Sequence, residues 1–76
     1  MIYLVIVEDR HNDVMVYPFT SRLRAIEQAR LTATARCRRS RDYSEKEVED
    51  WLFYATYTVE GDSVRVVEAE LDIELW

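Results

Sequence analysis

The most regular pattern in the chain is an alternation of apolar and acidic residues near its C-terminal end. Over residues 67–75 every second position is apolar, and each position between two apolar ones is acidic. Because successive side chains of a strand point to opposite faces, this alternation predicts a strand whose apolar set, Val67, Ala69, Leu71, Ile73 and Leu75, enters a core. The carboxylates on its other side form what we call the acidic row: Glu68, Glu70, Asp72 and Glu74.

Three further strands are predicted from shorter patterns. Residues 2–7 are apolar at every position, which is typical of a strand that is central in its sheet or covered on both faces. The polar stretch 8–13 predicts a turn into a second strand over residues 14–17, which Pro18 ends or confines to an edge. Residues 53–59 alternate and are rich in aromatic and β-branched side chains, so they predict a third strand, joined to the last one by a hairpin turn at Gly61.

One long helix and one short helix are predicted between the second and third strands. Thr20 or Ser21 can cap a helix over residues 21–39, where no Gly or Pro intervenes. Its apolar stripe is mostly small, which favours close packing on the sheet: Leu23, Ile26, Ala29, Ala33 and Cys37. Leu31 lies on the opposite side, with no core to enter. The segment 44–47 matches a capping box and predicts a second helix of about two turns, containing Val48, Trp51 and Leu52.

These elements give the order ββα(α)ββ in a single domain over residues 1–76. The expected fold is an α+β two-layer sandwich, with a four-stranded, mainly antiparallel sheet and one long helix on one face. We expect the other face to be open and to carry a mixed set of residues: Tyr3, Tyr54, Thr56, Thr58, Glu68 and Glu70. A chain of this length buries only roughly 60% of its unfolded surface, so a dimer or a partner would add stability.

Charge is divided along the chain. Ten basic and fifteen acidic residues give a net charge of −5. Seven arginines lie in residues 20–41 against one acid, and eleven acids lie in residues 42–76 against one lysine and one arginine. The distribution predicts a basic helix and an acidic C-terminal half.

The composition argues against catalysis. One His, one Cys and one Gly leave too few residues for a nucleophilic triad or a Gly-rich phosphate loop, so we expect no enzyme, no catalytic residue and no cofactor. Asp9, His11 and Asp13 could offer metal ligands, but a solvated turn is favoured and we expect no metal site. Cys37 fits a small buried residue better than a reactive thiolate.

The predicted location is the cytosol. The apolar run 2–7 is too short for a signal peptide or a membrane span, so we expect no membrane association. The single cysteine cannot form an internal disulfide, which fits a reducing compartment.

Two charged surfaces suggest different functions. The arginine-rich helix could bind phosphates, but a solvated face that pairs with the acidic half of the same fold is favoured, and direct nucleic-acid binding is not expected. The acidic row could protect an edge strand against aggregation. Alternatively, it could dock on an Arg- and Lys-lined surface of a partner protein.

The size, net charge, ββαββ pattern and acidic strand together resemble the small acidic inhibitor proteins encoded by phages and prophages, among them the anti-CRISPR proteins. The resemblance covers the overall character of the chain, with no motif to carry over residue by residue. It implies a non-enzymatic inhibitor that blocks a basic, nucleic-acid-binding site on its partner. The candidate partner-binding residues are Glu68, Glu70, Asp72, Glu74, Tyr54 and Leu31. A small homodimeric interaction protein, or a nucleic-acid binder using the arginine-rich helix, remain the alternatives.

Overall fold

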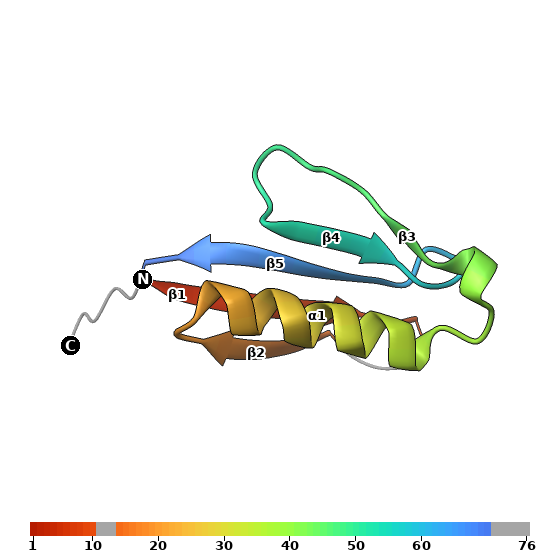
Figure 1. Cartoon of the computed structure of the whole chain (residues 1–76), viewed down its shortest axis with the longest axis horizontal. Helices are drawn as coiled ribbons and strands as arrows, with labels where there is room; N and C mark the ends of the chain where they lie inside the picture. Colours follow the sequence, from red (N-terminus) through yellow and green to blue (C-terminus); the bar gives the residue numbers. More distant parts are fainter. Residues whose placement is uncertain (11–13, 71–76) are drawn as a thin grey trace.

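The fold is a five-stranded antiparallel sheet with one helix packed on one face (Figure 1). A computed structural model describes residues 1–10 and 14–70. The elements in chain order are β1 (Ile2–Glu8), β2 (Met15–Phe19), α1 (Arg22–Arg36), the 3-10 turn η1 (Ser40–Asp42), β3 (Ser44–Glu45), β4 (Phe53–Thr56) and β5 (Ser63–Ala69). The predicted α+β class is confirmed, but the sheet has five strands rather than four.

The first strand of the chain lies beside the last described one. The strand order is β2-β1-β5-β4-β3, and Val5 of β1 lies opposite Tyr17 of β2 and Val66 of β5. The expectation that β1 is interior to the sheet is therefore confirmed. The interpretation of the C-terminal strand as an edge strand is wrong for β5, which is paired on both sides. The edges are β2, which includes Pro18, and the two-residue β3.

The core lies between α1 and the sheet. Its members with no exposed surface include Val5 and Val7 of β1, Val64 and Val66 of β5, and three alanines of α1: Ala25, Ala29 and Ala33. These alanines follow one another at intervals of four, so they form one stripe along the helix. Because alanine has a short side chain, the helix backbone can approach the sheet closely.

The predicted helical stripe is partly correct. Ala29 and Ala33 are buried, and Ile26 and Cys37 pack against the core, but Leu23 is 73% exposed. Leu23 lies about 120° around the helix from Ala29, beyond the strip that touches the sheet, and Ala25 takes its place. The Ser21 hydroxyl accepts a hydrogen bond from the backbone N–H of Arg24 at 3.3 Å and so caps the first turn.

The predicted second helix is wrong. Ser44 and Glu45 form β3 and pair with Thr56 and Ala55 of β4, and no described residue from 46 to 52 is helical. The N–H of Lys46 extends this pairing by donating to the carbonyl of Tyr54 at 2.9 Å. The backbone from Ser44 to Lys46 is thus paired with β4, because tertiary pairing prevailed over a local helix signal.

The hairpin between β4 and β5 forms at the predicted glycine. Gly61 has φ +98°, which an L side chain rarely adopts. The strand predicted over residues 53–59 is shorter in the structure, where β4 ends at Thr56. The turn has begun by Tyr57, whose N–H donates to the carbonyl of Asp62. The Asp62 carboxylate accepts from the N–H of Arg10 at 2.8 Å and from the Thr58 hydroxyl, which joins this turn to the end of β1.

The facing of β5 is the reverse of the predicted one. Val64 and Val66 point to the helix, so Val67 and Ala69 lie on the other face of the sheet and do not enter the core under α1. Glu68 shares the helix side and lies opposite Tyr3. Val64 and Val66 belong to one apolar alternation, and Val67 and Ala69 belong to another that is shifted by one residue. A shift of one residue exchanges the two faces of a strand, so the choice between the alternations decides which valines are buried.

The predicted membership of the uncovered face is therefore also partly wrong. Tyr3 and Glu68 lie on the helix side, whereas Tyr54 and Thr56 lie on the uncovered side, opposite Arg65 and Ser63. Thr58 and Glu70 lie outside the strands, and the remaining residues of the alternating segment, Leu71, Asp72, Ile73, Glu74 and Leu75, lie outside the described residues.

A first prediction tests the close packing of α1. Ala29→Leu should lower the free energy of unfolding by about 1–3 kcal/mol, because the larger side chain must displace the helix from the sheet. Ala35→Leu places the same side chain on the exposed side of α1 and should change stability by less than about 0.5 kcal/mol. Urea unfolding measures both, and equal destabilisation by the two variants would contradict the packing.

Candidate protein-binding surface

The side of the sheet away from α1 is apolar. The residues that alternate with the core positions form what we call the open sheet face: Ile2, Leu4, Ile6, Val16, Pro18, Val67 and Ala69. They extend without interruption across β5, β1 and β2, since Leu4 lies opposite both Val67 and Pro18. No helix in the described ranges packs on this side. A face of an antiparallel sheet left to water is commonly polar, so its apolar character indicates a contact surface.

Charged and aromatic side chains border one end of the open sheet face. Arg65 forms an ion pair with Glu8, and its guanidinium lies over the Trp51 ring at 5.1 Å from the centroid. The rings of Trp51 and Tyr54 are 5.0 Å apart and tilted by 51°. Trp51 comes from the segment between β3 and β4, which therefore reaches round the sheet edge to this side.

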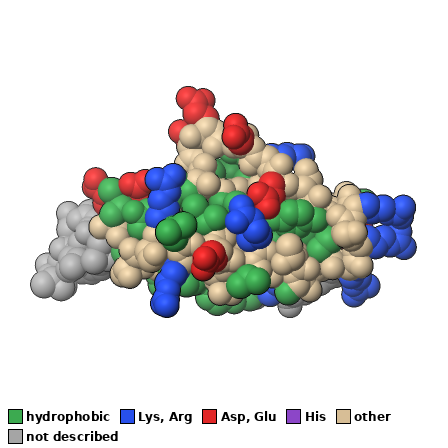
Figure 2. Space-filling model, in the orientation of Figure 1, with side chains coloured by type: hydrophobic (Ala, Val, Ile, Leu, Met, Phe, Trp, Pro, Cys, Tyr) green, Lys and Arg blue, Asp and Glu red, His purple; other side chains and the backbone are tan. Residues whose placement is uncertain are grey.

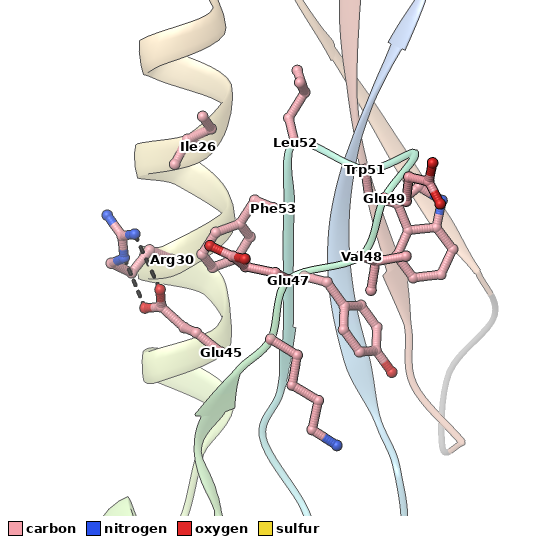
Figure 3. Close-up of a pocket in the computed structure, with 11 residues that line it drawn as sticks. Ile26, Arg30, Glu45, Glu47, Val48, Glu49, Trp51, Leu52 and Phe53 are labelled. Carbon is pink, nitrogen blue, oxygen red and sulfur yellow. Dashed lines mark hydrogen bonds and ion pairs between the residues drawn. The ribbon is translucent and has the colours of Figure 1, made fainter.

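That segment is a second candidate surface. Residues 46–52, which we call the acidic loop, carry Glu47, Glu49 and Asp50. All three side chains are exposed and form no ion pair with any described residue. The loop borders a cleft of about 890 Å³ beside α1, with Arg30 and Glu45 on one side and Glu49 and Trp51 on the other (Figure 3). Figure 2 shows acidic side chains gathered where this loop projects from the body.

The base of the acidic loop is held to α1 by a charged network. Arg30 donates two hydrogen bonds to the Glu45 carboxylate, at 3.0 and 3.2 Å, and the Tyr43 hydroxyl donates to it at 2.6 Å. The bonds from Arg30, and then from Tyr43, lower the pKa of Glu45. Burial, followed by the bond to Glu45, raises the pKa of Tyr43 to about 12. Arg30 also lies over the Phe53 ring, at 5.2 Å. This arginine therefore stabilises the fold.

A second network lies at the C-terminal end of α1. Arg36 pairs with Asp9 at 3.1 Å, and the Tyr57 hydroxyl donates to the same carboxylate at 2.8 Å. Tyr57 is 1% exposed, and its burial, then its hydrogen bond to Asp9, raise its pKa to about 12. The expected pairing of helix arginines with the acidic half of the fold is confirmed at Arg30, whose partner is Glu45, whereas Arg36 pairs with Asp9 near the other end of the chain.

The other arginines near the C-terminal end of α1 are exposed. Arg38, Arg39 and Arg41 follow the helix and form no ion pair within residues 1–10 and 14–70. They line a cleft of about 780 Å³ together with four acids: Asp9, Asp42, Glu60 and Asp62. In Figure 2 basic side chains gather at this end of the molecule, apart from the projecting acidic loop. The predicted separation of charge is present, although it divides a loop from a helix end.

The structure does not bring the predicted partner-binding residues onto one surface. Tyr54 lies on the open sheet face, Leu31 is 62% exposed on α1, and Glu68 lies on the helix side of β5. Glu70 is exposed just beyond β5, while Asp72 and Glu74 lie outside the described residues. Sequence reasoning predicted an uncovered face but missed its apolar character, and it missed Trp51 at the border of that face. The signal for the face was present in residues 2–7, which are apolar in both parities.

Three further expectations concern a metal site, a membrane-spanning helix and Cys37. Among the described residues, no three His, Cys, Asp or Glu side chains are grouped to hold a metal ion, and His11 and Asp13 of the candidate set lie outside that part of the chain. No helix in the described ranges is long and apolar enough to cross a membrane. Cys37 is half-buried, and its thiol donates to the carbonyl of Arg39 at 2.8 Å.

Comparison of the chain with models of protein families, with curated proteins and with solved structures found no match. The function must therefore be argued from these surfaces.

A second prediction concerns pH. The Tyr57 hydroxyl loses its proton near pH 10 in the unfolded chain and near 12 in the folded one, so its contribution is present below pH 10 and is lost as the pH rises from 10 to 12. Tyr57→Phe should therefore be less stable than the natural chain at pH 8, and the difference should shrink by about 2 kcal/mol at pH 12. Urea unfolding at several pH values measures it. A difference that is constant from pH 8 to 12 would contradict the assignment.

Proposed function

We propose that the chain is a non-enzymatic inhibitor that binds a protein partner, and that its acidic loop covers a basic, nucleic-acid-binding site on that partner. The observation that carries the proposal is the exposure of Glu47, Glu49 and Asp50 without a cation among the described residues. Glu45, next to the loop, is by contrast already paired with Arg30. The three carboxylates are therefore available to another molecule.

The loop is anchored at both ends, which lowers the entropic cost of binding. Its first residue continues the pairing of β3, and the N–H of Leu52 donates to the carbonyl of Val66 at 2.9 Å. Within it, the N–H of Trp51 donates to the carbonyl of Val48 at 3.1 Å. A surface held in one conformation loses less freedom when a partner binds. Carboxylates in such a loop form charge-assisted hydrogen bonds with Arg and Lys of the partner.

Aromatic side chains next to the loop supply the apolar part of the contact. Trp51 lies within the loop and its ring contacts that of Tyr54 in β4, and both residue types are enriched among the side chains that dominate binding energies. The exposed arginines lie at the end of α1, away from the loop in Figure 2. This separation of charge orients the molecule as it approaches a basic surface. The resemblance to small acidic phage inhibitors supports the same mode of action.

A third prediction tests the acidic loop. The triple substitution Glu47→Lys, Glu49→Lys and Asp50→Lys should abolish capture of a basic, nucleic-acid-binding protein from nuclease-treated host lysate. The captured protein, once purified, should bind the natural chain directly, and excess duplex DNA should compete with it. The affinity should fall at least about tenfold for the triple variant, because each lost charge-assisted contact is worth about 1.5–3 kcal/mol.

The matched control moves the same change of charge to the C-terminal acids, through Glu68→Lys, Glu70→Lys and Asp72→Lys. Both variants carry an equal net charge, so a general electrostatic effect would weaken both equally. Binding lost only in the control would place the interface on the acidic row. Binding retained in both variants would refute the acidic mode of recognition.

A nucleic-acid binder is a second candidate function, favoured by the exposed arginines beyond α1. If they bind phosphates, affinity for duplex DNA should fall steeply with salt, and Arg38→Ala, Arg39→Ala and Arg41→Ala together should flatten that dependence. The net charge of −5 opposes such binding, and we expect none at physiological salt. Fluorescence anisotropy of a labelled duplex measures it. Salt-dependent binding that the triple variant loses would favour this candidate over the inhibitor.

A further inference from the structure

The open sheet face is the largest feature that the acidic loop does not explain. Its seven apolar residues lie in consecutive rows: Ala69 with Ile2, Val67 with Leu4 and Pro18, and Ile6 with Val16. Only Ile6 has a charged neighbour, Arg65, in its own row. Val16 is 50% exposed and Pro18 is also exposed, whereas Ile6 beside Val16 is half-buried.

We propose that a second copy of this chain covers the open sheet face, so that two sheets pack face to face in a two-fold symmetric dimer. Each copy would then have helix α1 on one side of its sheet and the partner sheet on the other. This arrangement accounts for the apolar character of β1 in both parities, because both sides of the strand become interior. The proposal does not depend on the acidic loop or on its partner.

Charge favours a second copy over a charged partner. Among the described strand residues, the open sheet face carries one acid and one base, Glu8 and Arg65, and these pair with each other. The face is therefore neutral although the whole chain has a net charge of −5. A partner protein that binds through opposite charge would meet no unpaired charge among the described strand residues of this face. Two copies meet there without bringing like charges together, and a two-fold contact requires a surface complementary to itself.

The area of the face suits a weak dimer. Strands β2, β1, β5 and β4 have five, seven, seven and four residues. At ~3.4 Å per residue and ~4.8 Å between strands they give a flat footprint of about 380 Å² before the relief of the side chains is counted. Specific interfaces bury at least about 500 Å² on each partner. Because the side chains stand out from the sheet, the accessible area exceeds this flat footprint, which places the face at the low end of interface sizes.

The small core gives the dimer a stabilising role. Four of the ten buried apolar residues are alanines: Ala25, Ala29, Ala33 and Ala55. These side chains remove little apolar surface from water, and a domain of this length has a low fraction of buried surface. Covering the second side of the sheet adds burial that the single helix does not supply. Stability should therefore rise with protein concentration, by mass action.

The test is the oligomeric state of the full chain, by sedimentation equilibrium over a range of concentrations. A monomer–dimer equilibrium is expected. Leu4→Lys should raise the dimer dissociation constant at least about hundredfold, because two charges would be buried without partners. Leu31→Lys, which places the same charge on the exposed side of α1, should leave the constant within about threefold.

A milder variant separates a lost interface from a lost fold. Leu4→Thr keeps a strand-forming residue and should raise the dissociation constant at least about tenfold, with the circular dichroism spectrum unchanged. Because the face is neutral, the natural dimer should change its constant by less than about threefold between about 50 and 500 mM salt. A monomer at all concentrations, a dimer that survives both Leu4 variants, or one lost with Leu31→Lys would each overturn the proposal.

Discussion

One helix covers one side of a sheet whose interior strand β1 is apolar on both sides, and the rest of the structure depends on this mismatch. The alanine stripe of α1 lies close over Val5, Val7, Val64 and Val66, which forms a dry but thin core. Hydrophobic burial grows with the area removed from water, so small side chains pack closely but contribute little each. The other side of β1 carries Ile2, Leu4 and Ile6, and no helix within residues 1–10 and 14–70 covers it.

The ion pairs show how the fold fixes its less regular parts. Glu45, buttressed by Arg30 and Tyr43, holds the two-residue strand β3 against the helix. Asp9 receives Arg36 and Tyr57, which ties the end of α1 to the end of β1 and to the segment after β4. Both clusters bridge elements distant in sequence with hydrogen-bonded charges, and in each a tyrosine, Tyr43 or Tyr57, adds an apolar contact with the core.

The sequence predicts most of the fold where one pattern acts alone. The helix, its Ser21 cap, the apolar first strand and the turn at Gly61 follow from local rules, and the structure agrees with them. Prediction fails where two local signals compete. Ser44–Glu47 can begin a helix, yet Ser44 and Glu45 pair with strand β4. Local sequence rules cannot predict this pairing, because the partner residues are distant in the sequence. Val66 and Val67 offer two apolar registers, and only the position of α1 decides which one is buried. The acidic loop was missed for the same reason, because its acids were assigned to a helix.

The pairing of β1 with β5 also determines when the fold can form. β1 leaves the ribosome before both of its neighbours: β2 follows directly, but β5 begins only at Ser63. At a synthesis rate of about 5–20 residues per second, β1 waits roughly 3–12 s for that partner. During this interval its apolar residues, on both sides, have only β2 and α1 to contact. During this interval the nascent chain is therefore exposed to aggregation and to any chaperone that recognises extended apolar segments. The completed sheet ends this exposure, because β1 then lies in its interior.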